Sequence, residues 1–300
     1  MSATAARRRA VNTRRLPARA TVAALWVLLL VRAASGADTP DAPAGDSSTE
    51  INRKVTNPLS TTWSFKVINK VTFRDVGSHG DHPQYTLQLQ PIMPVWLSTE
   101  WKLIARPEFT FVDDTPYTNS QGDLHRTTGL GDTILDLVLS PQLRPWLIAL
   151  GSTFTFPTAN LDQTGMGKWQ AGPAGVVGYQ AKRWTAYLIA QQWWSFAGSS
   201  SRPAQNHLNL QYVASYFFGD GWSIGTSPTI KFDWRATDGK VTFPIGPTLG
   251  KVIKAGGVPV KLELQGVYMP VYPDANGDRF AVELQIIPVV PAPIEGPLLR

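Results

Sequence analysis

The segment that decides the fold is Trp101-Lys-Leu-Ile-Ala-Arg-Pro-Glu-Phe-Thr-Phe111. One set of alternate residues in it carries charge and the other set is apolar. The first set is Lys102, Ile104, Arg106, Glu108 and Thr110, and the second is Leu103, Ala105, Pro107, Phe109 and Phe111. Because successive side chains of a β-strand point to opposite faces, this period of two predicts a strand with one charged face. The same alternation recurs over residues 260–265 and 280–286.

About twelve segments of this kind follow one another from residue 57 onward, separated by clusters of Gly, Asp, Asn and Ser. They begin near Thr62, Gln84, Glu100, Gly129, Pro145, Gly167, Trp184, His207, Trp222, Lys240, Pro259 and Arg279. Their spacing suits hairpins in series, and no helical period of useful length interrupts them. The sequence therefore predicts an all-β, antiparallel protein of about twelve strands.

Aromatic residues discriminate between a soluble sandwich and a membrane barrel. Five pairs lie ten residues apart, and this even separation places both members on one face of a strand. The pairs are Trp63 and Phe73, Trp101 and Phe111, Trp146 and Phe156, Trp169 and Tyr179, and Trp184 and Trp194. Ten tilted residues cover roughly 25 Å, the height of the apolar band of an outer-membrane barrel, so we expect two aromatic girdles. We predict a transmembrane β-barrel over residues 57–291, surrounded by outer-membrane lipids. A soluble periplasmic lipid-binding protein is the alternative.

Prolines inside the predicted strands oppose this interpretation, since each one removes a hydrogen-bond donor from the sheet. They are Pro91, Pro94, Pro107, Pro173, Pro228, Pro244, Pro247 and Pro288. In a closed barrel we expect such residues at bulges or at the rims.

The N-terminal segment has the features of a signal peptide. An arginine-rich stretch precedes the apolar run Thr21–Val31, and small residues follow at Ala33–Ala37. We predict a cleaved signal peptide over residues 1–37, hence export. Residues 38–56 are predicted to be a disordered leader with little apolar surface to bury, and residues 292–300 to be a C-terminal tail.

The charge of the predicted mature chain excludes one class of function. Seven of the 28 basic residues are arginines of the signal segment, which leaves 21 Lys and Arg against 22 Asp and Glu. A nucleic-acid-binding protein needs a basic face that displaces phosphate counterions. We therefore expect no nucleic-acid partner.

The motifs for catalysis and cofactor binding are weak. The chain has no cysteine, and His79 and His82 lie in a loop without clear metal-ligand spacing, so we expect neither metal nor cofactor. The string Gly129–Asp132 is followed by a strand rather than by the helix of a phosphate loop. No Gly-x-Ser-x-Gly elbow occurs, so we expect no enzyme and assign no catalytic residue. A triad assembled from distant strands stays open.

Several strings resemble a known family. They are Thr127-Thr-Gly-Leu-Gly-Asp-Thr-Ile-Leu-Asp136, Phe154-Thr-Phe-Pro-Thr158, Thr164-Gly-Met-Gly-Lys-Trp-Gln-Ala-Gly-Pro173, Gln192-Trp-Trp-Ser-Phe-Ala-Gly198 and Phe280-Ala-Val-Glu-Leu-Gln-Ile-Ile-Pro288. In order along the chain, they resemble the bacterial "neuromedin U" or transporter-like barrels, which are related to the barrel family of the meta-pathway of phenol degradation. The resemblance implies a signal peptide, an outer-membrane barrel placed there by the assembly machinery, and movement of small, including hydrophobic, molecules. The continuation to Arg300 departs from the terminal aromatic residue that such barrels commonly have.

Polar residues on the face opposite the girdles are the candidate functional set. They are Lys102, Arg106, Glu108, Asp132, Asp136, Lys231, Asp233, Lys261, Glu263 and Glu283. They either line a pathway whose charges select solutes, or they form salt bridges that fill the lumen. The first interpretation predicts a channel or transporter for a small solute. The second predicts a structural barrel with a plugged lumen, and a membrane-embedded hydrolase is a third alternative.

Overall fold

The structure, a computed structural model, describes residues 47–273, 277–294 and 296–298. In the described part of the chain, fifteen strands pair into one antiparallel sheet. They are β1 (Trp63–Asp75), β2 (Asp81–Trp96), β3 (Trp101–Thr118), β4 (Leu124–Leu130), β5 (Thr133–Pro141), β6 (Trp146–Phe156), β7 (Lys168–Gln180), β8 (Trp184–Gly198), β9 (Asn206–Phe217), β10 (Trp222–Thr226), β11 (Thr229–Asp233), β12 (Val241–Ile245), β13 (Thr248–Ala255), β14 (Val258–Val271) and β15 (Asp278–Val290). Helix α2 (Ser48–Thr56) and the short turns η1 (Gly77–His79) and η2 (Gly219–Gly221) complete the described elements.

The sheet closes on itself. The first strand, β1, pairs with the last, β15, from Trp63 opposite Val290 to Arg74 opposite Asp278. Three strands of the wall are each interrupted once, namely β4–β5, β10–β11 and β12–β13, so the wall is a closed barrel of twelve antiparallel strands. Closure leaves no unpaired edge, as a bilayer requires. The predicted fold class and strand number are confirmed.

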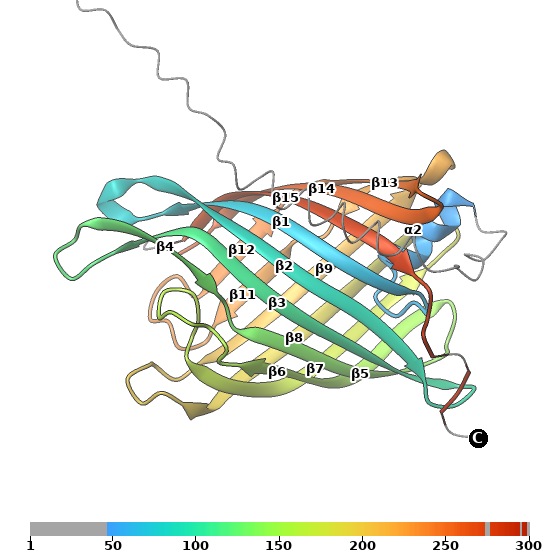
Figure 1. Cartoon of the computed structure of the whole chain (residues 1–300), viewed down its shortest axis with the longest axis horizontal. Helices are drawn as coiled ribbons and strands as arrows, with labels where there is room; N and C mark the ends of the chain where they lie inside the picture. Colours follow the sequence, from blue (N-terminus) through green and yellow to red (C-terminus); the bar gives the residue numbers. More distant parts are fainter. Residues whose placement is uncertain (1–46, 274–276, 295, 299–300) are drawn as a thin grey trace, which may run out of the picture. The chain divides into compact units, whose positions relative to one another are not determined.

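The two ends of the barrel differ (Figure 1). At one end, which we call the plug end, the connections are short, for example residues 97–100, 142–145 and 181–183, and α2 lies there. At the other, which we call the loop end, residues 157–167 and 199–205 form longer connections.

Helix α2 corrects the predicted leader. We expected residues 38–56 to be disordered, yet residues 48–56 form a helix that Ser47 caps by accepting a hydrogen bond from the Glu50 amide. The helix is stabilised by the barrel around it, since Asn52 is fully buried and Val55 is 7% exposed. Residues 1–46, which include the predicted signal peptide, lie outside the described residues. No helix of the described part is long and apolar enough to cross a membrane.

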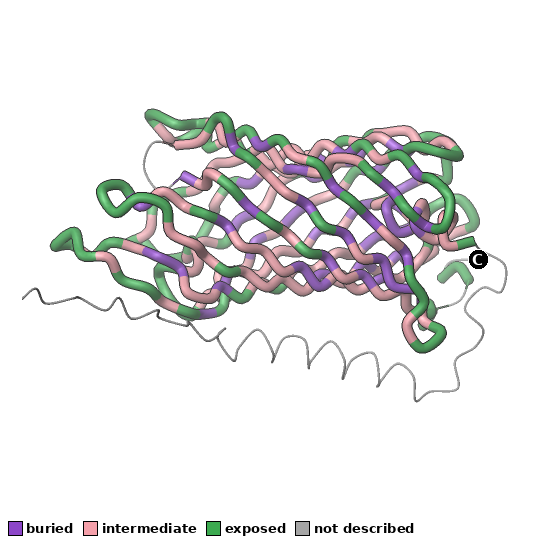
Figure 2. The backbone as a smooth tube through the Cα atoms, turned by 90° about the horizontal axis from the view of Figure 1, so that it is seen from above, coloured by how far each residue is buried: buried purple, intermediate pink, exposed green. Residues whose placement is uncertain are grey.

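The outer wall is apolar. Figure 2 shows buried and exposed residues alternating along the strands, and many large apolar residues are exposed, among them Leu150 at 71% and Trp146 at 56%. Near the plug end, Tyr179 contacts both Trp146 and Trp184 at ring-centroid distances of 5.2 and 5.4 Å. Of the other residues of the predicted girdles, Phe73, Trp101, Phe111, Trp169 and Trp194 are exposed, whereas Trp63 and Phe156 are half-buried. An apolar outer surface of this kind fits a lipid environment.

The prolines explain where the wall is weakly paired. Pro91 and Pro107 face each other across β2 and β3, where the pairing passes from Leu89–Phe109 directly to Met93–Ala105. Pro94 and Pro288 lie near the plug-end rim of their strands. Pro173 lies at a similar interruption between β7 and β8.

The longest interruption in the strand pairing of the wall lies between residues 226–230 and residues 243–247. We call these two segments the seam. Pro228 lies between β10 and β11, Pro247 lies between β12 and β13, and Pro244 lies at an irregular step of the β12–β14 pairing. The paired stretch ends at Gly225 opposite Thr248 and resumes at Lys231 opposite Thr242. The seam is joined mainly by other contacts, such as the 2.7 Å bonds from the Thr226 hydroxyl to the Gly246 carbonyl and from the Tyr212 hydroxyl to the Pro244 carbonyl.

Candidate functional site

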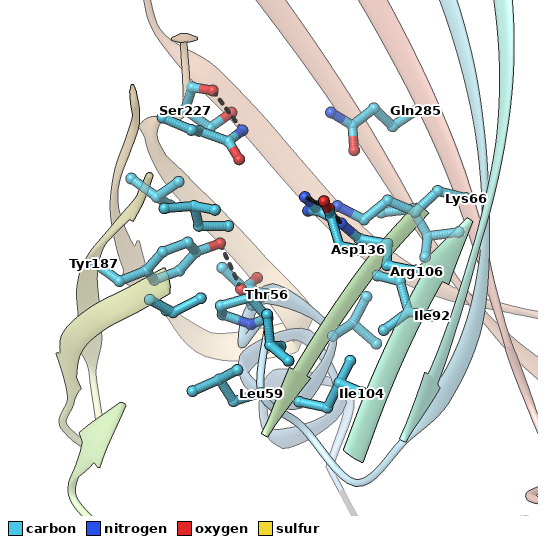
Figure 3. A pocket seen from close by; sticks show the side chains of 18 of the residues that line it. Thr56, Leu59, Lys66, Ile92, Ile104, Arg106, Asp136, Tyr187, Ser227 and Gln285 are labelled. Carbon is cyan, nitrogen blue, oxygen red and sulfur yellow. Dashed lines mark hydrogen bonds and ion pairs between the residues drawn. The ribbon is translucent and has the colours of Figure 1, made fainter. Parts of the chain in front are cut away.

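A cavity lies inside the barrel between α2 and the charged side chains of the wall (Figure 3). About 70 Å³ of it is open to the centre of a water molecule. Strands from most of the wall contribute to its lining, as do Val55, Thr56, Pro58 and Leu59 from α2 and the segment after it.

The plug end of the cavity is apolar. Leu59, which follows α2, packs into a buried cluster formed by inward-facing residues of six neighbouring strands. Its members on the wall are Ile92, Ile104, Val138, Leu147, Ala149, Ala174, Val176 and Ile189. The inner face is therefore not uniformly polar. An apolar layer seals the barrel around Leu59, and charged residues begin beyond it.

Arg106 and Asp136 form the central ion pair of the charged layer. The Arg106 Nε and Nη2 atoms lie 2.9 and 2.5 Å from Asp136 Oδ2. The Gln191 amide donates to both carboxylate oxygens of Asp136, at 2.8 and 2.9 Å. Asp136 is thus fully occupied by neighbours on β3 and β8.

Lys261 connects the charged layer to the helix. Its Nζ lies 2.6 Å from Glu263 Oε2 and donates to Thr56 Oγ1 at 2.8 Å. The Tyr187 hydroxyl donates to the Thr56 carbonyl at 2.9 Å, and Lys102 Nζ donates to the Leu59 carbonyl. The end of α2 and the segment after it are therefore held by side chains of three separate strands.

The middle of α2 is held in the same way. The Asn52 amide group donates to the Gly221 carbonyl at 2.9 Å and to Ser223 Oγ at 3.0 Å. These bonds run through side chains and are not part of the sheet. We call α2 together with residues 57–62 the plug, because this segment occupies the mouth of the barrel without being one of its strands.

The remaining candidates from the sequence lie apart from the cavity. Glu108 accepts hydrogen bonds from Gln88 and Gln90 at 2.6 and 2.7 Å, and Glu283 accepts one from Gln285 at 2.6 Å. Both side chains face the lumen on the loop-end side of Arg106, and glutamine side chains donate the hydrogen bonds that they accept.

Three other candidates lie toward the loop end. Lys231 lies 3.8 Å from Asp278. Asp132 accepts from the amides of Ala159 and Met166, and Asp233 accepts from the amides of Arg235 and Ala236. The two aspartates therefore hold loops at strand ends.

Sequence reasoning missed several residues of the site, namely Asn52, Thr56, Lys66, Tyr187 and Gln191. Two signals could have found some of them. Ser47 and Glu50 have the spacing of a capping box, which predicts a helix start. Lys66 continues the even-numbered polar series of β1, in which Ser64 and Thr72 are buried.

No cluster of three or more His, Cys, Asp or Glu residues capable of holding a metal ion occurs among the described residues. His79 and His82 lie at the exposed loop end. His79 Nε2 contacts the Gly122 carbonyl at 2.8 Å, and His82 Nε2 contacts the His79 carbonyl at 3.1 Å.

Comparison with known proteins identifies the architecture. No protein-family model and no curated protein matches the sequence. Among solved structures, the COG4313 outer membrane channel from Pseudomonas putida F1 superposes with a TM-score of 0.60 at 17% identity, covering 77% of this chain and 96% of that chain. The NanC porin matches with a TM-score of 0.48 at 11% identity, covering 75% and 99%.

Outer membrane phospholipase A from Escherichia coli matches with a TM-score of 0.45 at 12% identity, covering 79% of this chain and 97% of that chain. At such identities the first of these likenesses establishes the fold and nothing finer. Together with the closed twelve-strand wall and its apolar outer surface, it shows that this chain has the fold of an outer-membrane β-barrel.

Proposed function

We propose that the chain is a channel or transporter that passes small solutes, including apolar ones, across the outer membrane. This is the role implied by its sequence resemblance to the "neuromedin U" or transporter-like barrels. Export by an N-terminal signal peptide and insertion by the outer-membrane assembly machinery belong to the same proposal. The proposal includes no enzymatic role.

The observation that carries the proposal is the construction of the plug. The barrel encloses a cavity, and the plug that closes its mouth is held by side-chain hydrogen bonds to Gly221, Ser223, Tyr187 and Lys261. Breaking those bonds leaves the pairing of the wall intact, because the plug contributes no strand. A purely structural barrel gains nothing from a closure that can be released separately.

The absence of cysteine allows a direct test. The side chains of Asn52 and Ser223 meet at 3.0 Å, so the double variant Asn52→Cys with Ser223→Cys places two thiols at the contact between plug and wall, where oxidation can join them. Single-channel conductance in planar bilayers and uptake of small solutes into liposomes would be measured before and after reduction. We expect the oxidised form to be closed, and dithiothreitol to raise conductance and uptake to at least the wild-type level, because the reduced variant also lacks the hydrogen bonds from the Asn52 amide group to the wall.

The single variants Asn52→Cys and Ser223→Cys serve as controls, because each carries one thiol and cannot form the bond between plug and wall. If oxidised, reduced and wild-type proteins show the same negligible conductance and uptake, the barrel is structural and the proposal is wrong. Equal, high conductance in the oxidised and reduced forms would show that solutes pass without displacement of the plug.

A further inference from the structure

The lining of the cavity holds three cations and two acids. Five charged residues line it, namely Lys66, Arg106, Asp136, Lys261 and Glu263. Asp136 is paired with Arg106, and Glu263 is paired with Lys261. Within the part of the chain that the structure describes, Lys66 makes no hydrogen bond and no ion pair. The two other acids nearby on the inner wall, Glu108 and Glu283, accept from glutamines instead.

Lys66 is placed to meet a molecule inside the cavity. It lies on β1 opposite Gln90 of β2, on the face that also buries Ser64 and Thr72. Figure 3 shows its side chain and that of Arg106 converging on the level of Asp136, above the aliphatic residues. Arg106 binds Asp136 through Nε and Nη2, which leaves Nη1 as a second donor at this level.

The remainder of the cavity offers an apolar surface. Ile92, Ile104, Val138 and Ile189 line it between the charged layer and Leu59. The space open to water centres is about 70 Å³, which restricts a ligand in the cavity to a small molecule. A ligand with an apolar body toward Leu59 and a single charged group at Lys66 would match both parts.

We infer that the cavity is a binding site for a small monoanion with an apolar body, such as an aromatic carboxylate, and that Lys66 pairs with its negative group. This deepens the proposed function, because it names the chemical class of the solute. A carboxylate there gains charge-assisted hydrogen bonds. A neutral ligand leaves Lys66 unpaired, and a cation adds a like charge beside it.

The test is calorimetric titration of the full chain, folded in detergent, with benzoate, benzyl alcohol and benzylamine. These probes share one ring and differ in charge. We expect benzoate to bind at least about tenfold more tightly than benzyl alcohol, and Lys66→Gln to remove that preference. Lys66→Arg should retain it.

The matched control is Lys70→Gln. Lys70 lies on the same strand and face, four residues further from the plug, opposite Glu283 and outside the cavity lining. Its replacement should leave benzoate affinity unchanged, and titration of empty micelles corrects for partitioning. Folding of each variant is verified by the shift of its band between unheated and boiled gel samples.

The inference fails if benzoate and benzyl alcohol bind equally, if no probe binds the wild-type protein, or if Lys66→Gln behaves as Lys70→Gln does. Binding is measured without transport. A protein that binds benzoate but conducts nothing would therefore overturn the proposed channel and leave the binding site in place. A protein that conducts but does not bind benzoate would overturn the binding site and leave the proposed channel in place.

Discussion

At the scale of single residues, ion pairs of similar geometry differ in their surroundings. Arg106 and Asp136 approach to 2.5 Å with side-chain exposures of 19% and 7%. Arg126 and Asp114 approach to 2.6 Å at the loop end with exposures of 29% and 47%. The energetic consequence of losing one carboxylate depends on whether water can solvate the remaining guanidinium, so the two pairs should respond differently to the same substitution.

We predict that Asp136→Asn lowers the free energy of unfolding by about 3 kcal/mol, because it leaves the buried Arg106 charge without a counterion. The matched change Asp114→Asn should cost less than about 1 kcal/mol, since that pair is partly solvated and asparagine tolerates the left-handed backbone at position 114. Urea unfolding of the barrel in lipid vesicles measures both. Equal losses would mean that the lumen around Asp136 is as solvated as the loop end.

The same contrast shows what alternation in the sequence can predict about a site. It placed Arg106, Asp136, Lys261 and Glu263 on the inner face, and all four line the cavity. It could not show that Asp132 and Asp233 bind loop amides, because the period of two ends where the strand ends.

Pairing across the lumen is also invisible to a local pattern. Gln191 reaches Asp136 from a strand that is 55 residues away in the sequence. That Lys66 is left without a partner depends on which distant acids are already bound, Glu263 by Lys261 and Glu283 by Gln285.

At the scale of elements, α2 shows why the leader was predicted wrongly. The stretch Ser47–Thr56 is poor in apolar residues, and a sequence with so little to bury is expected to be disordered on its own. The helix is nevertheless ordered, since the barrel supplies partners for its polar residues. Asn52 is fully buried because Gly221 and Ser223 accept its hydrogen bonds.

This dependence leads to a prediction about opening. Asn52→Ala removes the two buried hydrogen bonds that the Asn52 amide group donates to the wall, worth about 2 kcal/mol together, and should increase the frequency of open events about thirtyfold. The melting of the barrel should not change. Single-channel recording measures the first quantity, and the temperature at which the folded band is lost from gels measures the second.

The control for this variant is Asn119→Ala, which lies in the exposed turn between β3 and β4 and bonds within that turn. It should leave the opening frequency at the wild-type value. An unchanged frequency in Asn52→Ala would show that its two hydrogen bonds do not keep the plug in place.

The seam is the second element with a testable consequence. Its prolines were visible in the sequence, but their gathering on neighbouring strands depends on the register of the sheet. Because sheet hydrogen bonds are sparse there, we predict that amides of residues 226–230 and 243–247 exchange at least about tenfold faster than those of residues 66–72, where β1 is paired on both sides. Hydrogen exchange with mass spectrometry compares the two segments in one sample. Equal protection would show that other contacts of the seam replace the missing ladder.

At the scale of the whole molecule, the closed wall was predictable because its signals are local and repeated. Alternation and the ten-residue aromatic spacing recur in many strands, so an error in one strand boundary leaves the barrel prediction unchanged. The orientation of the barrel depends on weaker information, namely that outer-membrane barrels have short periplasmic turns and longer extracellular loops. By this rule the plug end faces the periplasm and the loop end faces the outside.

The orientation can be tested with two single cysteines in the otherwise cysteine-free chain. Ser200→Cys places a thiol in the exposed connection at the loop end, and Lys182→Cys places one in an exposed turn at the plug end. A membrane-impermeant maleimide applied to intact cells should label position 200 and leave position 182 unlabelled until the outer membrane is permeabilised. Since both positions are exposed in the folded protein, their intrinsic reactivity in detergent provides the control. Labelling of position 182 alone in intact cells would reverse the orientation, and the plug would then close the barrel against the outside. Labelling of neither position until permeabilisation would place the chain away from the cell surface altogether.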